Sequence, residues 1–171
     1  MLSKDGSPDI YVLDLISMSL KKVVSHFAID TEPTWLPNGK ELLFTSDRSG
    51  NPQVYKTNVE TGAVQRVTFE GKYNARPQVL PDGSGFVVIT RRANRFHIAL
   101  QKFDNDRIWI LSQTALDESP TIAPNGFMLL YATKYNEQGI LAAVSVDGGI
   151  KFRLPSSSTN VRDPAWSPLY R

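Results

Sequence analysis

A phrase that begins with proline recurs along this chain at a nearly constant period. Pro33, Pro77, Pro120 and Pro164 lie 44, 43 and 44 residues apart. The first three phrases each end in an Asn-Gly or Asp-Gly pair, whereas the fourth stops before one. Self-similarity at a fixed period of roughly 20 to 50 residues indicates a repeat architecture, in which one unit cannot bury its apolar face alone. The period therefore constrains the fold more than any single motif does.

Each repeat holds four short β-prone runs separated by turn sequences. Asn-Gly and Asp-Gly pairs tolerate positive φ and mark a hairpin between the first two runs. The runs are short, and no helical periodicity lies between them. The second runs cover 41–46, 85–90 and 128–133, the third 53–57, 96–101 and 140–146, and the fourth 64–69, 107–112 and 151–155. Four-stranded units of about 40–45 residues predict an all-β fold, namely a β-propeller of four-stranded antiparallel blades.

The repeats account for three full blades and two partial ones, so we expect an incomplete propeller. The full blades cover about 31–70, 74–112 and 117–155, and the partial blades cover 1–27 and 160–171. Projecting the period backward places a third strand at 8–15 and a fourth at 21–25, while 160–171 is expected to supply a first, innermost strand. Our interpretation is a truncated sequence, and the alternative is a four-bladed ring with one defective blade.

Large apolar side chains recur within the blades, and we expect them to pack between neighbouring sheets. They are Trp35, Phe44, Tyr55, Phe86, Ile98, Tyr131 and Trp166. Stacking the sheets face to face around an axis would bury the apolar faces that a single sheet leaves open.

The composition excludes several functional classes. A formal net charge of +2, without a dense run of Lys or Arg, does not fit a nucleic-acid-binding protein. The longest apolar stretches, such as 127–132, fall well short of the roughly 18 residues that span a bilayer, so we expect no direct membrane insertion. Residues 1–6 lack the charged and apolar regions of a signal peptide.

No catalytic motif is present, and we expect neither enzyme activity nor a cofactor. His26 and His97 have no partner at a metal-ligand spacing, and the chain has no cysteine. A Gly-x-Ser-x-Gly nucleophile elbow and a glycine-rich phosphate loop are both missing. If a cation were bound, its ligands would be four carboxylates near the first strands, those of Glu32, Asp117, Glu118 and Asp163. We expect no metal site.

Two blocks of the sequence resemble the TolB family in specific residues. One runs from Thr31-Glu32-Pro33-Thr34-Trp35 to Gln53-Val54-Tyr55-Lys56, and the other is the ending Pro164-Ala165-Trp166-Ser167-Pro168. The resemblance covers the whole chain and concerns the C-terminal propeller of that family. Residues 91–95, Arg-Arg-Ala-Asn-Arg, are more basic than we would expect from it.

The resemblance implies a periplasmic, non-enzymatic protein of the Tol–Pal system in Gram-negative cell envelopes. Family members carry an N-terminal α/β domain and a six-bladed propeller that binds the peptidoglycan-associated lipoprotein Pal, and colicins use the same surface. The implied partners are therefore a Pal-like lipoprotein, other Tol-system proteins and possible colicins. The implied role is a scaffold that contributes to outer-membrane integrity and cell division. No segment of the sequence matches the family's signal peptide or N-terminal domain.

Connections in a propeller blade alternate between two faces. We call one the short-turn face, which carries the turns at 37–39, 81–83 and 124–126. The other is the variable-loop face, which carries 30–32, 47–48, 74–76, 91–92, 117–118, 134–135 and 162–163. Variable loops on a rigid scaffold are where binding function concentrates. The candidate partner-binding residues are Thr31, Glu32, Arg48, Arg76, Arg91, Asp117, Glu118, Arg162 and Asp163. Among them, Thr31 and Glu32 match the family positions at the Pal interface.

A second interpretation is the propeller lid of a prolyl-oligopeptidase-like serine peptidase, in which the ring gates substrate entry. An adjoining sequence with a serine nucleophile would favour this interpretation. An upstream signal peptide and α/β domain would favour the protein-binding scaffold.

Overall fold

The chain is built from strands alone over the residues that the structure describes. This computed structural model describes residues 1–3, 6–154 and 160–168, and none of them is helical. No described segment is therefore a helix that could cross a membrane. The described residues form one two-stranded and three four-stranded antiparallel sheets, and within each sheet the strands that are consecutive in sequence pair with each other. The fold class expected from the repeat is confirmed.

The sheets are numbered here in chain order. Sheet 1 comprises β1 (Ile10–Leu13) and β2 (Leu20–Val24). Sheet 2 comprises β3 (Asp30–Trp35), β4 (Glu41–Ser46), β5 (Gln53–Asn58) and β6 (Val64–Arg66). Sheet 3 comprises β7 (Asn74–Val79), β8 (Gly85–Arg92), β9 (Arg95–Lys102) and β10 (Trp109–Ile110). Sheet 4 comprises β11 (Glu118–Ile122), β12 (Met128–Tyr135), β13 (Gln138–Ser145) and β14 (Lys151–Arg153).

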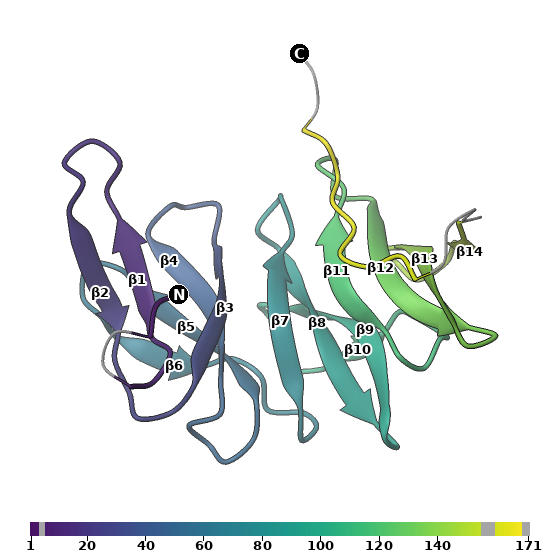
Figure 1. The fold of residues 1–171 in the computed structure, drawn as a ribbon, viewed down its shortest axis with the longest axis horizontal. Helices are drawn as coiled ribbons and strands as arrows, with labels where there is room; N and C mark the ends of the chain where they lie inside the picture. Colours follow the sequence, from purple (N-terminus) through teal and green to yellow (C-terminus); the bar gives the residue numbers. More distant parts are fainter. Residues whose placement is uncertain (4–5, 155–159, 169–171) are drawn as a thin grey trace.

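The sheets follow one another along the long axis of the molecule, from β1 and β2 at one end to β12, β13 and β14 at the other (Figure 1). The first strands of the three four-stranded sheets are neighbours, because β3 contacts β7 and β7 contacts β11. This is the arrangement of blades around a propeller axis, with the first strands innermost. The variable loops lie at the lower ends of the strands in Figure 1.

The Asn-Gly and Asp-Gly pairs form the turns between the first and second strands. In each pair only the glycine takes a positive φ, of 65° at Gly39, 72° at Gly83 and 76° at Gly126. The preceding Asn or Asp instead accepts a hydrogen bond from the N–H two residues later, as Asn38 does from Lys40 at 2.9 Å. The glycine therefore supplies the positive φ that the turn needs, and the Asn or Asp side chain stabilises the turn with a hydrogen bond.

Apolar side chains from facing sheets form three clusters. Alternate residues of a strand point to opposite faces of its sheet, so Val87 and Val88 belong to different clusters. The cluster between sheets 1 and 2 contains Ile10, Val23, Val24, Leu42, Phe44 and Tyr55. The next contains Leu43, Val54, Phe86, Val88, Ala99 and Ile108, and the third is centred on Val87, Ile98, Leu129 and Tyr131. Burial of each large side chain contributes about 1.5–3 kcal/mol.

Five of the seven side chains expected between sheets are buried there, and the two tryptophans are not. Trp35 is 47% exposed and Trp166 is 37% exposed. Trp35 is the last residue of β3, beside a short turn, so its ring lies at the margin of the packed face. The indole of Trp166 donates to the carbonyl of Thr121 at 3.2 Å and remains at the surface. The packing expected for these two residues was wrong.

Residues 160–168 lie where a further first strand would begin, but they form no strand. The N–H of Val161 donates to the carbonyl of Gly139 at 3.2 Å, as that of Asp117 does to Phe96 and that of Asn74 does to Pro52. A strand needs a hydrogen-bonded neighbour along its length, and no described strand pairs with this segment. The expected strand is therefore missing from 160–168, while 155–159 and 169–171 lie outside the described residues.

Candidate protein-binding face

One strained backbone position recurs before each of the four repeated prolines. Glu32, Arg76, Ser119 and Asp163 have φ values of 57°, 54°, 51° and 49°, and each directly precedes a proline. Positive φ is uncommon for residues other than glycine and persists only where the surrounding structure holds it. The pairing register shifts at this point in β3, β7 and β11. Such irregularities re-aim side chains, and here they direct equivalent residues of successive sheets toward one another.

These four residues form a continuous line of hydrogen bonds across the sheets. Arg76 Nε donates to Glu32 Oε1 at 2.8 Å, and the backbone N–H of Arg76 donates to Glu32 Oε2 at 2.9 Å. The other end of the guanidinium donates to the Ser119 hydroxyl at 2.6 Å, which in turn donates to Asp163 at 2.5 Å. All four residues line one cavity of about 350 Å³. The sequence reasoning missed Ser119, although its place before a repeated proline marks it as equivalent to Glu32.

Thr31 directly precedes the first residue of this line, and Arg48 stabilises the buried Asp30 beside it. Thr31 is half-buried and pairs with Thr45 across the ladder of β3 and β4. Both terminal oxygens of the buried Asp30 accept from Arg48 Nη2, at 2.9 and 3.0 Å. The same guanidinium lies over the rings of Phe44 and Tyr55, at 5.4 and 4.9 Å from their centroids. Arg48 is thus committed to the fold more than to a partner.

Asp117 is also an internal residue. It is 2% exposed, and its carboxylate accepts from the hydroxyls of Ser112 and Thr133. Asp30 and Asn74 occupy the equivalent positions of sheets 2 and 3 and are likewise buried and hydrogen-bonded. A buried carboxylate with its oxygens satisfied stabilises the connection into the first strand and is not available to a partner.

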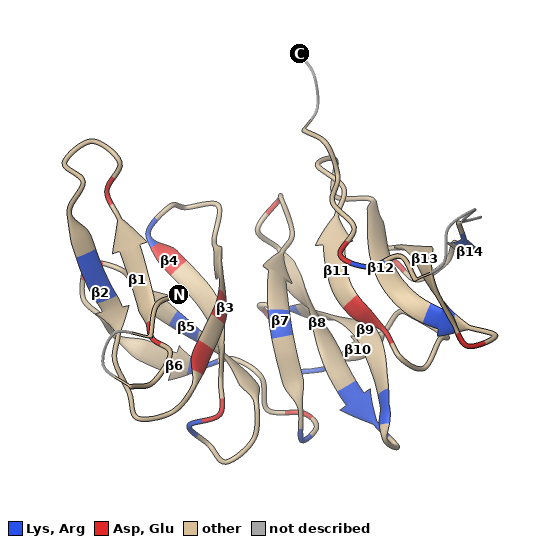
Figure 2. Ribbon diagram, in the orientation of Figure 1, with Lys and Arg blue, Asp and Glu red and all other residues tan. Residues whose placement is uncertain are grey.

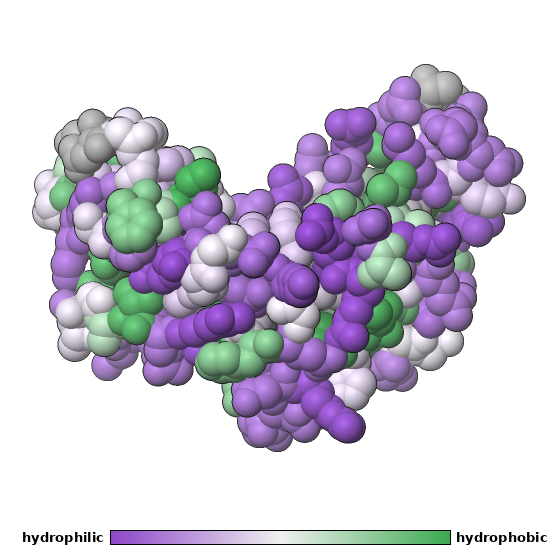
Figure 3. All heavy atoms as spheres, turned by 90° about the horizontal axis from the view of Figure 1, so that it is seen from below, coloured by the Kyte–Doolittle hydropathy of each residue, from purple (hydrophilic) through white to green (hydrophobic). Residues whose placement is uncertain are grey.

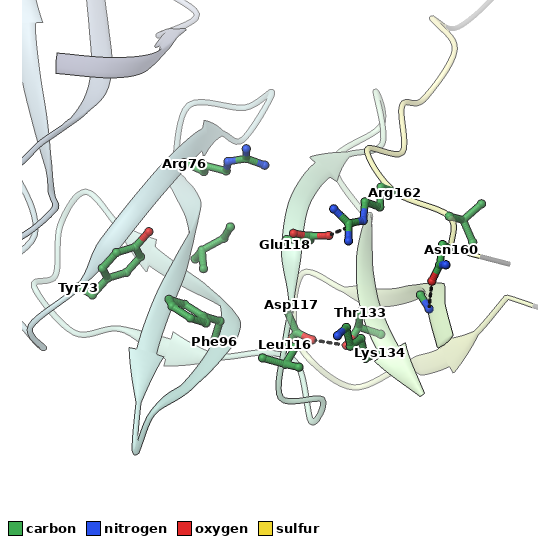
Figure 4. Close-up of a pocket in the computed structure, with 13 residues that line it drawn as sticks. Tyr73, Arg76, Phe96, Leu116, Asp117, Glu118, Thr133, Lys134, Asn160 and Arg162 are labelled. Atoms are coloured by element: carbon green, nitrogen blue, oxygen red, sulfur yellow. Dashed lines mark hydrogen bonds and ion pairs between the residues drawn. The ribbon is translucent and has the colours of Figure 1, made fainter. Parts of the chain in front are cut away.

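Glu118 and Arg162 lie at the edge of a second cavity, of about 390 Å³, on the same face (Figure 4). Their charged groups are 3.7 Å apart and both side chains are about half exposed or more, at 48% and 67%. Tyr73 and Phe96, whose rings meet edge to face at 5.3 Å, form the opposite wall. Burial raises the pKa of Tyr73, so its phenol stays a neutral hydrogen-bond group near pH 7. This cavity combines an aromatic wall with charged groups opposite it, as ligand sites commonly combine apolar lining with a few polar groups.

The candidate residues lie on one face, as the alternation of loops predicts. The N–H of Ile29, in a fourth-to-first connection, donates to Asp47, in a second-to-third connection, at 2.9 Å. Arg91 is the second-last residue of β8 on this face, and its guanidinium lies 5.9 Å from the ring centroid of Tyr73. Seen from this side, the molecule is largely hydrophilic and curves round a hollow between its two ends (Figure 3).

The four carboxylates considered for a cation do not gather. Glu32 faces Arg76, Glu118 faces Arg162, and Asp117 is enclosed by hydroxyls. No group of three or more His, Cys, Asp or Glu residues within the described ranges has the geometry to hold a metal ion.

The fold and this face together define a β-propeller with one variable, charged face that surrounds its axis. A family model described as the TolB beta propeller domain matches residues 1–170, so the chain belongs to the TolB β-propeller family. The chain is 43% identical to the "Tol-Pal system protein TolB" of Nitrosospira multiformis over 107 residues, which are 63% of this chain and 24% of that protein. It is 48% identical to the protein of the same name from Pseudomonas aeruginosa over 102 residues, which are 58% of this chain and 24% of that protein. The chain thus spans about a quarter of the length of these curated relatives.

A solved structure agrees with the sequence relatives. The crystal structure of TolB from Acinetobacter baumannii superposes with a TM-score of 0.86 at 39% identity, covering 94% of this chain and 41% of that one. Enzymes also share the fold, since a puromycin hydrolase superposes with a TM-score of 0.66 at 10% identity over 79% of this chain and 22% of its own. That likeness concerns the fold alone.

Proposed function

We propose that this chain is a protein-interaction scaffold of the Tol–Pal system, without enzyme activity, that acts in the periplasm. Its partner is a Pal-like lipoprotein. Other Tol-system proteins and colicins bind the same face. This binding contributes to outer-membrane integrity and cell division. The relatives at 43% and 48% identity carry the name of that system, which supports this assignment over a peptidase lid.

The hydrogen-bonded line of Glu32, Arg76, Ser119 and Asp163 is the observation that carries the proposal. It fixes charged and polar groups at the centre of the variable-loop face with little freedom left to lose. Pre-organised groups bind with a smaller entropic cost, and contacts near the centre of an interface contribute most. Thr31, Glu118 and Arg162 surround the line and extend the same face, whereas Arg48 and Asp117 hold it from inside.

Calorimetric titration with the soluble domain of a Pal lipoprotein tests the proposal. Glu32→Ala is expected to weaken binding by about 1–3 kcal/mol, the scale of losing a charged hydrogen bond. Asn38→Ala, on the short-turn face, is expected to lower stability and leave the affinity of the folded protein unchanged. Thr31→Ala is a second probe of the binding face, because it leaves the bonds of Glu32 in place. Unchanged binding by both Glu32→Ala and Thr31→Ala would overturn the proposal, as would a greater loss in folded Asn38→Ala.

A further inference from the structure

The hairpin of β8 and β9 carries three arginines, and a described carboxylate neutralises only one of them. Arg91, Arg92 and Arg95 lie at the lower ends of these strands, where Figure 2 shows basic residues gathered. Arg92 pairs with Glu70, whose carboxylate also accepts the N–H of Ile108 at 2.8 Å. Arg91 and Arg95 are exposed, and neither pairs with a carboxylate in the part of the chain that the structure describes. Two arginines therefore remain available at the margin of the variable-loop face.

The backbone of this hairpin holds the arginines in fixed positions. Ala93 and Asn94 form a two-residue turn with φ values of 46° and 62°, which matches the twist of the paired strands. The strands pair up to the turn, with Arg92 opposite Arg95 and Arg91 opposite Phe96. The guanidinium of Arg91 is placed further by its contact with the Tyr73 ring. A rigid hairpin reduces the ordering cost when a partner binds these side chains.

Lys134 extends the charge to the neighbouring sheet. It lies on β12, is exposed, and lines the cavity that Phe96 and Tyr73 also line. Glu118 at the same cavity faces Arg162, and Asp117 is buried, so neither neutralises Lys134. Glu137, which has no ion pair with another described residue, lies at the tip of the next hairpin and offsets only part of the charge. We call Arg91, Arg95 and Lys134 the basic rim.

We propose that the basic rim receives an acidic segment of the protein partner, whose carboxylates bind Arg91, Arg95 and Lys134 beside the cavity. This proposal rests on the proposed function, because it deepens the chemistry of the same face. Complementary charge at the margin of an interface raises the association rate more than it slows dissociation, and it is screened by salt. The rim thus selects partners by charge and guides them toward the line of Glu32 and Arg76.

A decamer of L-glutamate serves as the probe, titrated into the 171-residue chain by nuclear magnetic resonance. The double variant Arg95→Glu with Lys134→Glu is expected to weaken binding at least about tenfold at low ionic strength, and all binding is expected to fall steeply with salt. The matched control is Lys40→Glu with Lys151→Glu, which changes the net charge equally at exposed positions away from the rim. We expect this control to stay within about twofold of the parent.

Three outcomes would overturn the proposal. Equal losses in the two double variants would show attraction to net charge alone. Binding of anionic phosphatidylglycerol vesicles through the rim, with no binding of the glutamate decamer, would assign the rim to a lipid surface. No shift of Arg91, Arg95 or Lys134 signals on titration would place the contact elsewhere.

The milder pair Arg95→Ser with Lys134→Ser repeats the measurement if the charge-reversed protein loses its near-ultraviolet circular dichroism. Failure of the proposed function can be distinguished from failure of this proposal, since titration of Glu32→Ala with a Pal domain tests the binding face without the glutamate decamer.

Discussion

Glu32 and Arg76 occupy the same position in consecutive sheets and are joined through both the side chain and the backbone of Arg76. The Arg76 guanidinium donates to one carboxylate oxygen at 2.8 Å, and its N–H donates to the other at 2.9 Å. That second oxygen also accepts from the hydroxyl of Thr45 at 2.8 Å. A residue at the centre of the candidate binding face therefore also ties sheet 2 to sheet 3, so stability and binding are linked there.

Glu32→Ala is accordingly expected to lower the free energy of unfolding by about 1–3 kcal/mol, since the N–H and guanidinium of Arg76 and the hydroxyl of Thr45 lose their shared acceptor. Urea denaturation followed by circular dichroism measures this change. Glu60→Ala is the control, because Glu60 is exposed and its carboxylate makes no described ion pair. A Glu32→Ala protein as stable as the parent would show that the bond between the sheets contributes nothing.

Arg48→Met is expected to destabilise the chain by about 3–5 kcal/mol, because it leaves the buried carboxylate of Asp30 without its partner. Adding Asp30→Asn to this variant is expected to recover part of the loss, since the uncompensated charge is then removed. Thermal unfolding of the two single variants and the double variant gives the coupling. Additive losses would contradict a direct dependence between these two residues.

Gly85 and Gly50 are required for different reasons: Gly85 because a side chain would clash there, and Gly50 because its backbone has a positive φ. A Cβ at Gly85 would lie 2.5 Å from the carbonyl oxygen of Gln101 in the adjacent strand, so Gly85→Ala is expected to cost more than about 2 kcal/mol. Gly50 has a φ of 90° and open space around it, so Gly50→Ala is expected to cost only about 1 kcal/mol from backbone strain. Chemical denaturation of both variants measures the difference, and a reversed order would contradict the packing of β8 against β9.

Glu70 links stability to acid pH. The N–H of Ile108 and the Arg92 guanidinium hold the pKa of Glu70 below its ordinary value. A carboxylate whose pKa is lower in the folded state stabilises the fold above its unfolded pKa of about 4.3 and loses that effect as the pH falls through the folded value. The parent is thus expected to be more stable than Glu70→Gln near pH 6, and the gap is expected to close toward pH 3. Melting temperatures of both proteins, measured across this pH range, test the prediction. A difference in melting temperature that stays constant from pH 6 to pH 3 would contradict it.

Much of the fold follows from the sequence because each blade repeats the same local chemistry. The period of Pro33, Pro77 and Pro120 and the glycine of each short turn are enough to place the strands. Trp35 and Trp166 were misjudged because aromatic character does not reveal whether a residue lies in the middle or at the end of a packed face.

The candidate face was harder to predict, because charge alone does not separate a binding residue from a structural one. Arg48 and Asp117 look like rim charges in the sequence, yet Arg48 neutralises Asp30 and Asp117 is enclosed by hydroxyls. Ser119 looks unremarkable but continues the line that Glu32 and Arg76 begin. The repeated proline marks Glu32, Arg76, Ser119 and Asp163 as equivalent positions, but the positive φ that aims their side chains together is not visible in a sequence.

Hydrogen exchange of the 171-residue chain, with and without a soluble Pal domain, tests the central claim most directly. We expect slower exchange on binding at 30–32, 47–48, 74–76 and 91–95, on the variable-loop face. Exchange at 37–39, 81–83 and 124–126, on the short-turn face, is expected to remain unchanged. Protection confined to the short turns, or no protection at a Pal concentration that saturates binding, would contradict the assignment of the binding face.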